Sequence, residues 1–451
     1  MNAEVNQDFI EQVVADLSEG LWSVHEDFIA HAHPADLAEI AERLDYERAR
    51  ELIERLENAR VAEMLMELDA EQRSKFIEDY SGKKIASDFV EHLDSDDAAD
   101  LINELDDRLK KEVLNNLENE EQARDLAQLL VYPEGTAGAL MATELIKVNA
   151  RWKVLQCVKE MRKQAEDIEQ VHAIYVVDDE DCLLGTLSLK KLLTTSTQTP
   201  IEEVYSKKVQ SVEITTEAEE VSQKMQKYDL VVMPVVDPLG HLVGRITIDD
   251  VLDFVTEEAK EDYNLASGLT DEVDISDSIY TITRARLPWL IIGLFGGLLA
   301  ASVIGRYEGD IEILPQMAFF IPLIAAMGGN VGVQSSAIIV QGLASQSISG
   351  SVWLRLLKEL GVALINGVIL GALIVGAGLF LGYGQQLALT VAVSLVAVII
   401  VAALIGTFVP LILDRYKIDP ALATGPFITT LNDILGLFLY FQIGRLILSV
   451  I

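Results

Sequence analysis

The chain has 451 residues, half of them hydrophobic, with 35 Lys and Arg against 71 Asp and Glu. The first 283 residues hold 27 of the basic and 64 of the acidic residues, whereas the remainder is apolar and nearly neutral. This division excludes a single soluble domain and a disordered chain. The negative charge also excludes a nucleic-acid-binding protein, because phosphates would be repelled.

The acidic part shows neither a basic start nor an apolar run in its first thirty residues. We therefore expect no cleavable signal and a cytoplasmic location for this part. Its cysteines, Cys157 and Cys182, form no thiol cluster and do not have the spacing of a metal-ligand pair, so no disulfide framework is expected.

A unit of about twelve residues repeats between Leu44 and Leu117, and each unit is marked by a leucine followed by an acid. The markers are Leu44-Asp45, Leu56-Glu57, Leu68-Asp69, Leu93-Asp94, Leu105-Asp106 and Leu117-Glu118. Helix formers with apolar residues at helical spacing separate them, so each unit predicts a short helix after an acid-capped turn. Stacked units would bury one another's apolar faces. We expect an acidic α-helical superhelix over residues 1–131.

A second repeat aligns residues 172–193 with residues 231–252 at an offset of 59, without gaps. The identities include Val176 with Val235, Asp178 with Asp237, and Gly185 with Gly244. Each copy predicts a β-α-β-β-α unit. The tandem resembles a pair of cystathionine-β-synthase (CBS) domains, which we place at 132–200 and 201–252.

CBS pairs often bind adenine nucleotides through a glycine followed by Ser/Thr-x-x-Asp. The second copy carries this pattern at Gly244, Thr247 and Asp250, whereas the first has Lys191 in place of the aspartate. The resemblance therefore implies at most one conventional nucleotide site, with ATP as the candidate ligand.

An acidic connecting helix is expected over residues 253–283. Acids recur at spacings of three and four from the end of the second CBS copy onward, at Asp250, Asp253, Glu257, Glu258, Glu261 and Asp262. Like charges at these spacings cost stability in water. The stripe is either a solvated connector of no consequence or a helix that needs a divalent cation.

Residues 284–451 predict a transmembrane domain, because a helix of about 20 apolar residues crosses a bilayer. Five spans are expected, at 287–307, 314–342, 357–382, 386–413 and 419–449. Basic residues precede the first span and lie between the second and third and between the fourth and fifth. The positive-inside rule then places the amino-terminal domains in the cytoplasm and the carboxyl end outside.

The fifth span contains Asp433, which we expect to be the only acid in the interior of a span, because the other acids of this half lie in loops or at span ends. A charge at bilayer depth costs about 2.5–3.5 kcal/mol on insertion scales. Arg445 lies twelve residues away, about 18 Å along a helix, too far for a direct pair. Asp433 is therefore either a protonated carboxyl bonded to Asn432 or a carboxylate facing an aqueous cation path. Thr429 and Gly425 share its helix face.

Two further features concern the backbone of the spans. GGNVGVQ at 328–334 follows Pro322 and predicts a weakened helix whose free carbonyls line a path, unless its small residues serve only packing. Gly425-Pro426 predicts a break in the last helix, two turns before Asp433.

This order of parts resembles the MgtE family of magnesium channels. The motifs that carry the resemblance are YPEGTAG at 132–138, GGNVGVQ in the second span and DPALATGPFITTLND at 419–433. The resemblance implies a homodimer in the bilayer, with an ion path between subunits along the second and fifth spans and Mg²⁺ held by Asp433. Pore-lining residues would include Asn330, Gln334, Gly425 and Thr429.

The resemblance also implies that cytosolic Mg²⁺ binds the acidic domains and closes the pore. By position, the regulatory ligands would include Asp94, Glu217, Glu219, Asp229, Asp250, Asp253, Glu258, Glu261 and Asp262. No catalytic arrangement is evident, so we expect no enzyme.

The expected function is a channel of the plasma (inner) membrane that moves Mg²⁺ into the cytoplasm down its gradient. Alternatives are a transporter of another divalent metal, such as cobalt or manganese, or a membrane-anchored metal or nucleotide sensor. The absence of His and Cys from the spans favours a hard ion, since softer metals prefer those ligands.

Overall fold

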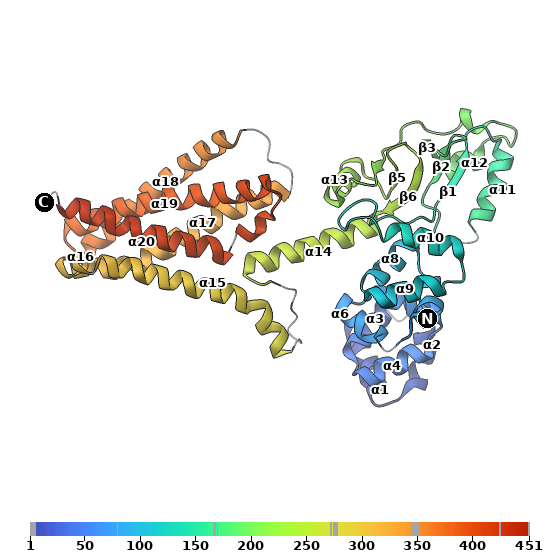
Figure 1. Cartoon of the computed structure of the whole chain (residues 1–451), viewed down its shortest axis with the longest axis horizontal. Coiled ribbons are helices and arrows are strands. Elements are labelled where there is room, and N and C mark those ends of the chain that lie inside the picture. Colours follow the sequence, from blue (N-terminus) through green and yellow to red (C-terminus); the bar gives the residue numbers. More distant parts are fainter. Residues whose placement is uncertain are drawn as a thin grey trace. The chain divides into compact units, whose positions relative to one another are not determined.

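The computed structural model describes residues 6–78, 80–165, 168, 170–270, 273, 278–344, 351–423 and 425–449. Residues 271–272 and 274–277 of the predicted connecting segment lie outside the described residues. The chain divides into two compact units, Met1–Val255 and Thr256–Ile451. Figure 1 colours the first unit from blue through green and the second from yellow to red.

The first unit begins with short helices, which confirm the predicted helical repeat. Asp45 and Asp106 cap two of them by accepting hydrogen bonds from the backbone N–H of Arg48 at 3.0 Å and of Leu109 at 2.8 Å. The elements are α1 (Gln7–Ser18), α2 (Trp22–His31), α3 (Pro34–Arg43), α4 (Tyr46–Arg55), α5 (Asn58–Met66), α6 (Ala70–Ile77), α7 (Gly82–Asp88), the 3₁₀ turn η1 (Val90–His92), α8 (Ser95–Asn103), α9 (Asp107–Asn116) and α10 (Glu120–Leu129).

Two β-α-β-β-α units follow, as the second repeat predicts. The first contains β1 (Ile146–Asn149), α11 (Val154–Gln164), β2 (Ile174–Val177), β3 (Leu183–Leu187) and α12 (Leu189–Thr194). After the 3₁₀ turn η2 (Ile201–Glu203), the second contains β4 (Val212–Glu213), α13 (Ala218–Tyr228), β5 (Val232–Val236), β6 (Leu242–Thr247) and α14 (Ile248–Ser267). In each three-stranded sheet the first pair is parallel and the second antiparallel.

The two sheets are joined through their equivalent turns. Leu183 N–H donates to the carbonyl of Gly240, and Leu242 N–H donates to the carbonyl of Asp181, both at 3.0 Å. In both sheets the pairing shifts at the same place, after Val176 and after Val235. The 59-residue offset of the sequence is therefore also the offset of the structural repeat.

The apolar core of the first unit is unevenly divided. The helical domain and the second CBS unit share one buried cluster, to which Met233, Val235 and Ile246 contribute. The first CBS unit has a cluster of its own around Ile146, Val176 and other aliphatic side chains. The helical domain is thus packed against the second CBS unit, and acids at that junction lie on opposing elements.

The second unit holds five helices that are long and apolar enough to cross a membrane among its described residues. Its elements are α15 (Ile279–Arg306), α16 (Glu308–Ile313), the 3₁₀ turn η3 (Pro315–Phe320), α17 (Ile321–Ala344), α18 (Val352–Phe380), α19 (Gln385–Arg415), the 3₁₀ turn η4 (Pro420–Ala423) and α20 (Gly425–Ser449). Helix α19 packs against α17, α18 and α20, and α15 packs along α20 (Figure 1).

The structure bears on two predictions about the helices of this unit. Helix α17 runs unbroken through GGNVGVQ in the conformation described, as the packing alternative predicts, because Gly328, Gly329 and Gly332 let it pack closely against its neighbours. Gly425-Pro426 begins α20 rather than breaking it, since proline is tolerated in the first turn of a helix.

Candidate functional site

Asp433 lies where α20 passes α17, and its side chain is half-buried. A Cβ placed on Gly329 of α17 would lie 3.7 Å from the Asp433 carboxylate and 3.5 Å from the methyl group of Thr429. The hydroxyl of Thr429 donates to its own helix, at 3.0 Å from the carbonyl of Pro426. Gly329, Thr429 and Asp433 thus form one small surface, with glycine leaving the carboxylate uncovered from the α17 side.

Asn432 points away from that surface. It is only 2% exposed, and neither atom of its amide has a hydrogen-bond partner among the described residues. The hydrogen bond between a protonated Asp433 and Asn432, one of the two interpretations of the sequence, is therefore not formed in this conformation.

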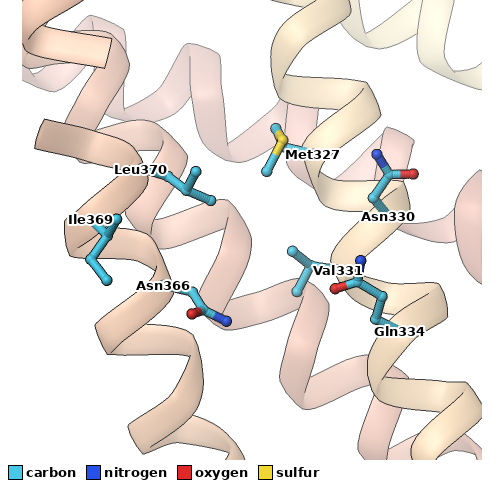
Figure 2. A pocket seen from close by; sticks show the side chains of 7 residues that line it. All are labelled: Met327, Asn330, Val331, Gln334, Asn366, Ile369 and Leu370. Atoms are coloured by element: carbon cyan, nitrogen blue, oxygen red, sulfur yellow. The ribbon is translucent and has the colours of Figure 1, made fainter. Parts of the chain in front are cut away.

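Asn330 and Gln334 line a pocket to which Asp433 does not contribute. Figure 2 shows this pocket between α17 and α18, with Asn366 on the α18 side. The cavity has a volume of about 290 Å³, and Met327, Val331, Ile369 and Leu370 complete its lining. Sequence reasoning missed Asn366, although a carboxamide in an otherwise apolar span was a signal that could have found it.

A second acid lies near the start of a span, as expected for the third span. Helix α18 begins at Val352, five residues before the predicted span, so Glu359 lies two turns into the helix. The buried hydroxyl of Ser335 on α17 donates to the Glu359 carboxylate at 2.6 Å. Glu359 is a candidate for bracing α17 against α18.

The end of α14 meets the start of α20 within the second unit. A Cβ on Gly268 would lie 2.7 Å from the ring of Pro426, and one on Gly425 would collide with the carbonyl of Ala266. Just beyond the helix, Thr270 N–H and its hydroxyl both donate to the carbonyl of Ala285 on α15, at 3.1 Å. The acidic connecting helix therefore ends against the helix that carries Asp433.

A cluster of acids lies where the helical domain packs on the second CBS unit. Burial raises the pKa of Asp97 to about 7, and the charge of Asp250 adds to the effect. Burial, with Asp250, Asp97 and Asp94 nearby, also raises the pKa of Asp96 well above its ordinary value. Asp94 and Asp250, predicted as regulatory ligands, are thus brought together, and Asp96 and Asp97 are partners that the sequence did not single out.

Two side chains already engage the predicted ligands in this cluster. Arg245, which is 8% exposed, donates to the carboxylate of Asp94 at 3.2 Å and to the carbonyl of Glu144 at 2.6 Å. Thr247 donates through its backbone N–H to Asp250 at 2.9 Å and through its hydroxyl at 2.5 Å. The predicted nucleotide residues Thr247 and Asp250 are therefore bonded to each other, and Asp250 belongs to both candidate sites.

The remaining predicted ligands are not gathered into one place. Glu217 and Glu219 lie at the start of α13 and Asp229 at its end, where Asp229 adopts a left-handed φ of 51°. Asp253, Glu258 and Glu261 are exposed on α14, and Asp262 is half-buried there. Over the described ranges, no three acids, histidines or cysteines are arranged so that they could hold a metal ion.

Comparison with known proteins identifies the family to which the chain belongs. A model described as MgtE, divalent cation transporter, matches residues 321–443; the MgtE intracellular N domain matches 32–135; and CBS domains match 137–196 and 201–257. The chain belongs to the MgtE family. This family is one of transporters, and the predicted architecture of helical domain, CBS pair and five candidate spans is confirmed.

Similar members of the MgtE family include two proteins named magnesium transporter MgtE. That of Thermus thermophilus is 36% identical over 334 residues, covering 72% of this chain and 73% of the relative. That of Enterococcus faecalis is 35% identical over 327 residues, covering 72% of each. A solved cytosolic domain of the Mg²⁺ channel MgtE in complex with ATP has a TM-score of 0.50 and 31% identity, covering 53% of this chain and 99% of that structure.

Proposed function

We propose that this MgtE-family protein is a Mg²⁺ channel that admits the ion into the cytoplasm and is closed by cytosolic Mg²⁺. One observation carries the proposal: Asp433, a carboxylate in a membrane helix, lies beside Gly329 and Thr429, where small side chains leave room for a hydrated ion. Mg²⁺ loses its water reluctantly, so a pore conducts it best by binding its hydration shell.

The complete path is proposed to lie between two copies of the chain, in line with the resemblance to a homodimeric family. A pair of Asp433 carboxylates would then hold the divalent ion through its waters more strongly than a monovalent ion. The membrane potential supplies about 2.3 kcal/mol per charge for each 100 mV, and twice that for Mg²⁺. Transport therefore needs no ATP hydrolysis.

Closure is proposed to follow from neutralising the acidic first unit. The pKa of Asp97 is raised to about 7, first by burial and then by the charge of Asp250, so without Mg²⁺ the carboxylates of this cluster repel one another. An ion that bridges these acids stabilises only the conformation that holds them together. Since α14 starts at this cluster and ends against Gly425, it is the element suited to carry closure to the path.

Orientation and location complete the proposal. The basic residues flanking the spans support an orientation with the helical domain, the CBS pair and α14 in the cytoplasm and the carboxyl end outside the plasma membrane. Regulation by Mg²⁺ requires this orientation, because the first unit must sample the compartment that the ion enters.

Binding of ATP at the second CBS unit is a secondary proposal. It is supported by Gly244, Thr247 and Asp250 and by the ATP found in the similar cytosolic domain. The bond between Thr247 and Asp250 would have to be exchanged for contacts with ribose. Because Asp250 also belongs to the acidic cluster, ATP and Mg²⁺ would influence each other's binding.

Mg²⁺ uptake into liposomes tests the channel, with wild type and Asp433→Asn compared at low and high Mg²⁺ on the cytoplasmic side. Wild type should conduct at low Mg²⁺ and close at high Mg²⁺, and Asp433→Asn should lose uptake at least 100-fold. Asp414→Asn, at the exposed end of α19, makes the same change of charge and should transport as wild type.

The same vesicles separate the competing functions. Uptake by Asp433→Asn at the wild-type rate would overturn the proposed path. A protein that compacts with Mg²⁺ but never conducts would be a sensor. Faster uptake of Mn²⁺ or Co²⁺ than of Mg²⁺ would make it a transporter of that metal.

A further inference from the structure

Asn432 is buried at the contact between α17 and α20 in a space that a glycine provides. A Cβ on Gly332 would collide with the Asn432 amide nitrogen and would lie 2.8 Å from a methyl group of Ile428. A Cβ on Gly328, one turn earlier in α17, would lie 3.9 Å from the Cβ of Asn432. The carboxamide therefore lies against the backbone of α17 between Gly328 and Gly332.

This position is costly for a polar side chain in the conformation described. Neither the oxygen nor the nitrogen of the amide has a partner among the described residues, and only 2% of the side chain is exposed. A buried amide without hydrogen bonds is destabilising, and water does not relieve it in the hydrocarbon region. Leucine has nearly the same shape and would fill the space without this cost.

The α17 backbone beside the amide is also the part of the helix least suited to stay helical. Three glycines lie within five residues, at 328, 329 and 332, and glycine is the poorest helix former after proline. Yet α17 is continuous here, so every backbone group near the amide is bonded within the helix. An unwound turn would release those groups directly against Asn432.

We propose that Asn432 is a positioning residue for a second conformation of α17, in which residues 328–332 unwind and bond to its carboxamide. Gly329 belongs to this turn and also borders Asp433 and Thr429. Unwinding therefore turns backbone carbonyls toward the surface proposed to hold hydrated Mg²⁺. The amide that is unpaired in the continuous helix is paired in the unwound one. The expected effect on Mg²⁺ transport rests on the proposed channel function, whereas the unwinding of residues 328–332 and its bonding to Asn432 do not depend on it.

Asn432→Leu tests the inference in the full chain, reconstituted in lipid nanodiscs and liposomes. Three measurements are made: the midpoint of thermal unfolding, hydrogen exchange of the peptide covering 328–334, and Mg²⁺ uptake. We expect a midpoint equal to or above that of wild type, exchange slowed at least tenfold, and uptake reduced at least tenfold. Asn432→Ala, which cannot overpack the site, should show the same slowing of exchange and loss of uptake.

Thr407→Val is the matched control. The hydroxyl of Thr407 on α19 is likewise buried without a partner among the described residues, but it belongs to no part of the proposed path. Its replacement should leave uptake and the exchange of 328–334 unchanged, whatever it does to stability.

Each other outcome contradicts the inference. Wild-type uptake by Asn432→Leu, unchanged exchange at 328–334, or a clear loss of stability in both Asn432 variants would show that the amide only fills space or is already bonded in this conformation. Failure of wild type itself to transport would count against the proposed function alone, because the exchange and unfolding measurements still decide the role of Asn432.

Discussion

The two units accommodate polar side chains in different ways. In the first unit, large aliphatic side chains form the core, and acids crowd at its edge with Arg245 and Thr247 among them. In the second unit, glycines bring helices together and polar side chains are few: Glu359 is bonded to Ser335, and Asn432 lies over Gly332. In the first unit, protonation or a cation can relieve surplus charge, whereas in a membrane the position of each group decides its effect.

The contrast implies different sensitivities. The first unit should respond to the number of its charges, and hence to pH and Mg²⁺. The second should respond to single atoms at helix contacts, because lipid offers no hydrophobic driving force between helices and close packing must hold them.

Gly332→Ala should have the largest effect on stability. The added Cβ would meet the Asn432 amide and Ile428, so α17 and α20 must separate. Overpacking of this kind costs about 1–3 kcal/mol. The measurement is the midpoint of thermal unfolding of the purified chain in detergent, which should fall by several degrees.

Gly297→Ala is the control for that prediction, since nothing lies within 4 Å of the Cβ it would add on α15. It should be neutral or slightly stabilising, because alanine favours a helix by about 1 kcal/mol over glycine. Equal midpoints for the two variants would show that close glycine contact does not hold these helices.

Asp250→Asn should have the next largest effect, on regulation rather than on folding. Asp250 is the acid whose charge acts on Asp96, Asp97 and Asp253 together. Without it, a bridging Mg²⁺ loses a ligand, and the Mg²⁺ concentration that half-protects the first unit from protease should rise about tenfold, or about 1.4 kcal/mol.

Asp249→Asn removes the same charge from the neighbouring, exposed position on α14. Its protection midpoint should shift much less. If both variants shifted equally, total charge rather than a local site would govern the response to Mg²⁺.

Much of this arrangement could be predicted from the sequence, for identifiable reasons. The length of the apolar segments predicts the spans, and the 59-residue offset predicts the CBS pair, because the first signal is local and the second is repeated. The packing of a helix against its neighbours was harder to predict from the sequence. Glycines at 328, 329 and 332 predicted a weak helix, but their packing against other helices decides the outcome.

The candidate site divides in the same way. Asp433, Thr429 and Gly425 share α20, so helical spacing alone grouped them. Asn366 and Asp97 required knowledge of which elements pack together, since Asn366 faces α17 across a pocket and Asp97 is influenced by a residue 153 positions later. Contacts between distant segments leave no periodic signal in one sequence.

The smallest predicted effect is a pH dependence confined to the first unit. Burial, followed by the charge of Asp250, raises the pKa of Asp97 from 3.8 to about 7. Between these values the folded state binds more protons than the unfolded state, so stability without Mg²⁺ should fall as pH rises from about 4 to 7 and then level off. Mg²⁺ competes with the same proton and should bind more tightly over that range.

Unfolding midpoints in EDTA at several pH values between 5 and 8 measure this effect, with Asp97→Asn as the decisive variant and Asp107→Asn, an exposed change of charge on α9, as its control. Asp97→Asn should reduce the pH dependence of the first unit's transition, because no proton is then taken up on folding at this position, although Asp96, whose pKa is also raised, keeps part of it. The transition of the second unit should not move in either variant. If the unfolding midpoint of Asp97→Asn changed with pH as steeply as that of wild type, the acidic cluster would contain no charge repulsion for Mg²⁺ to relieve. The two units would then not differ in their response to charge.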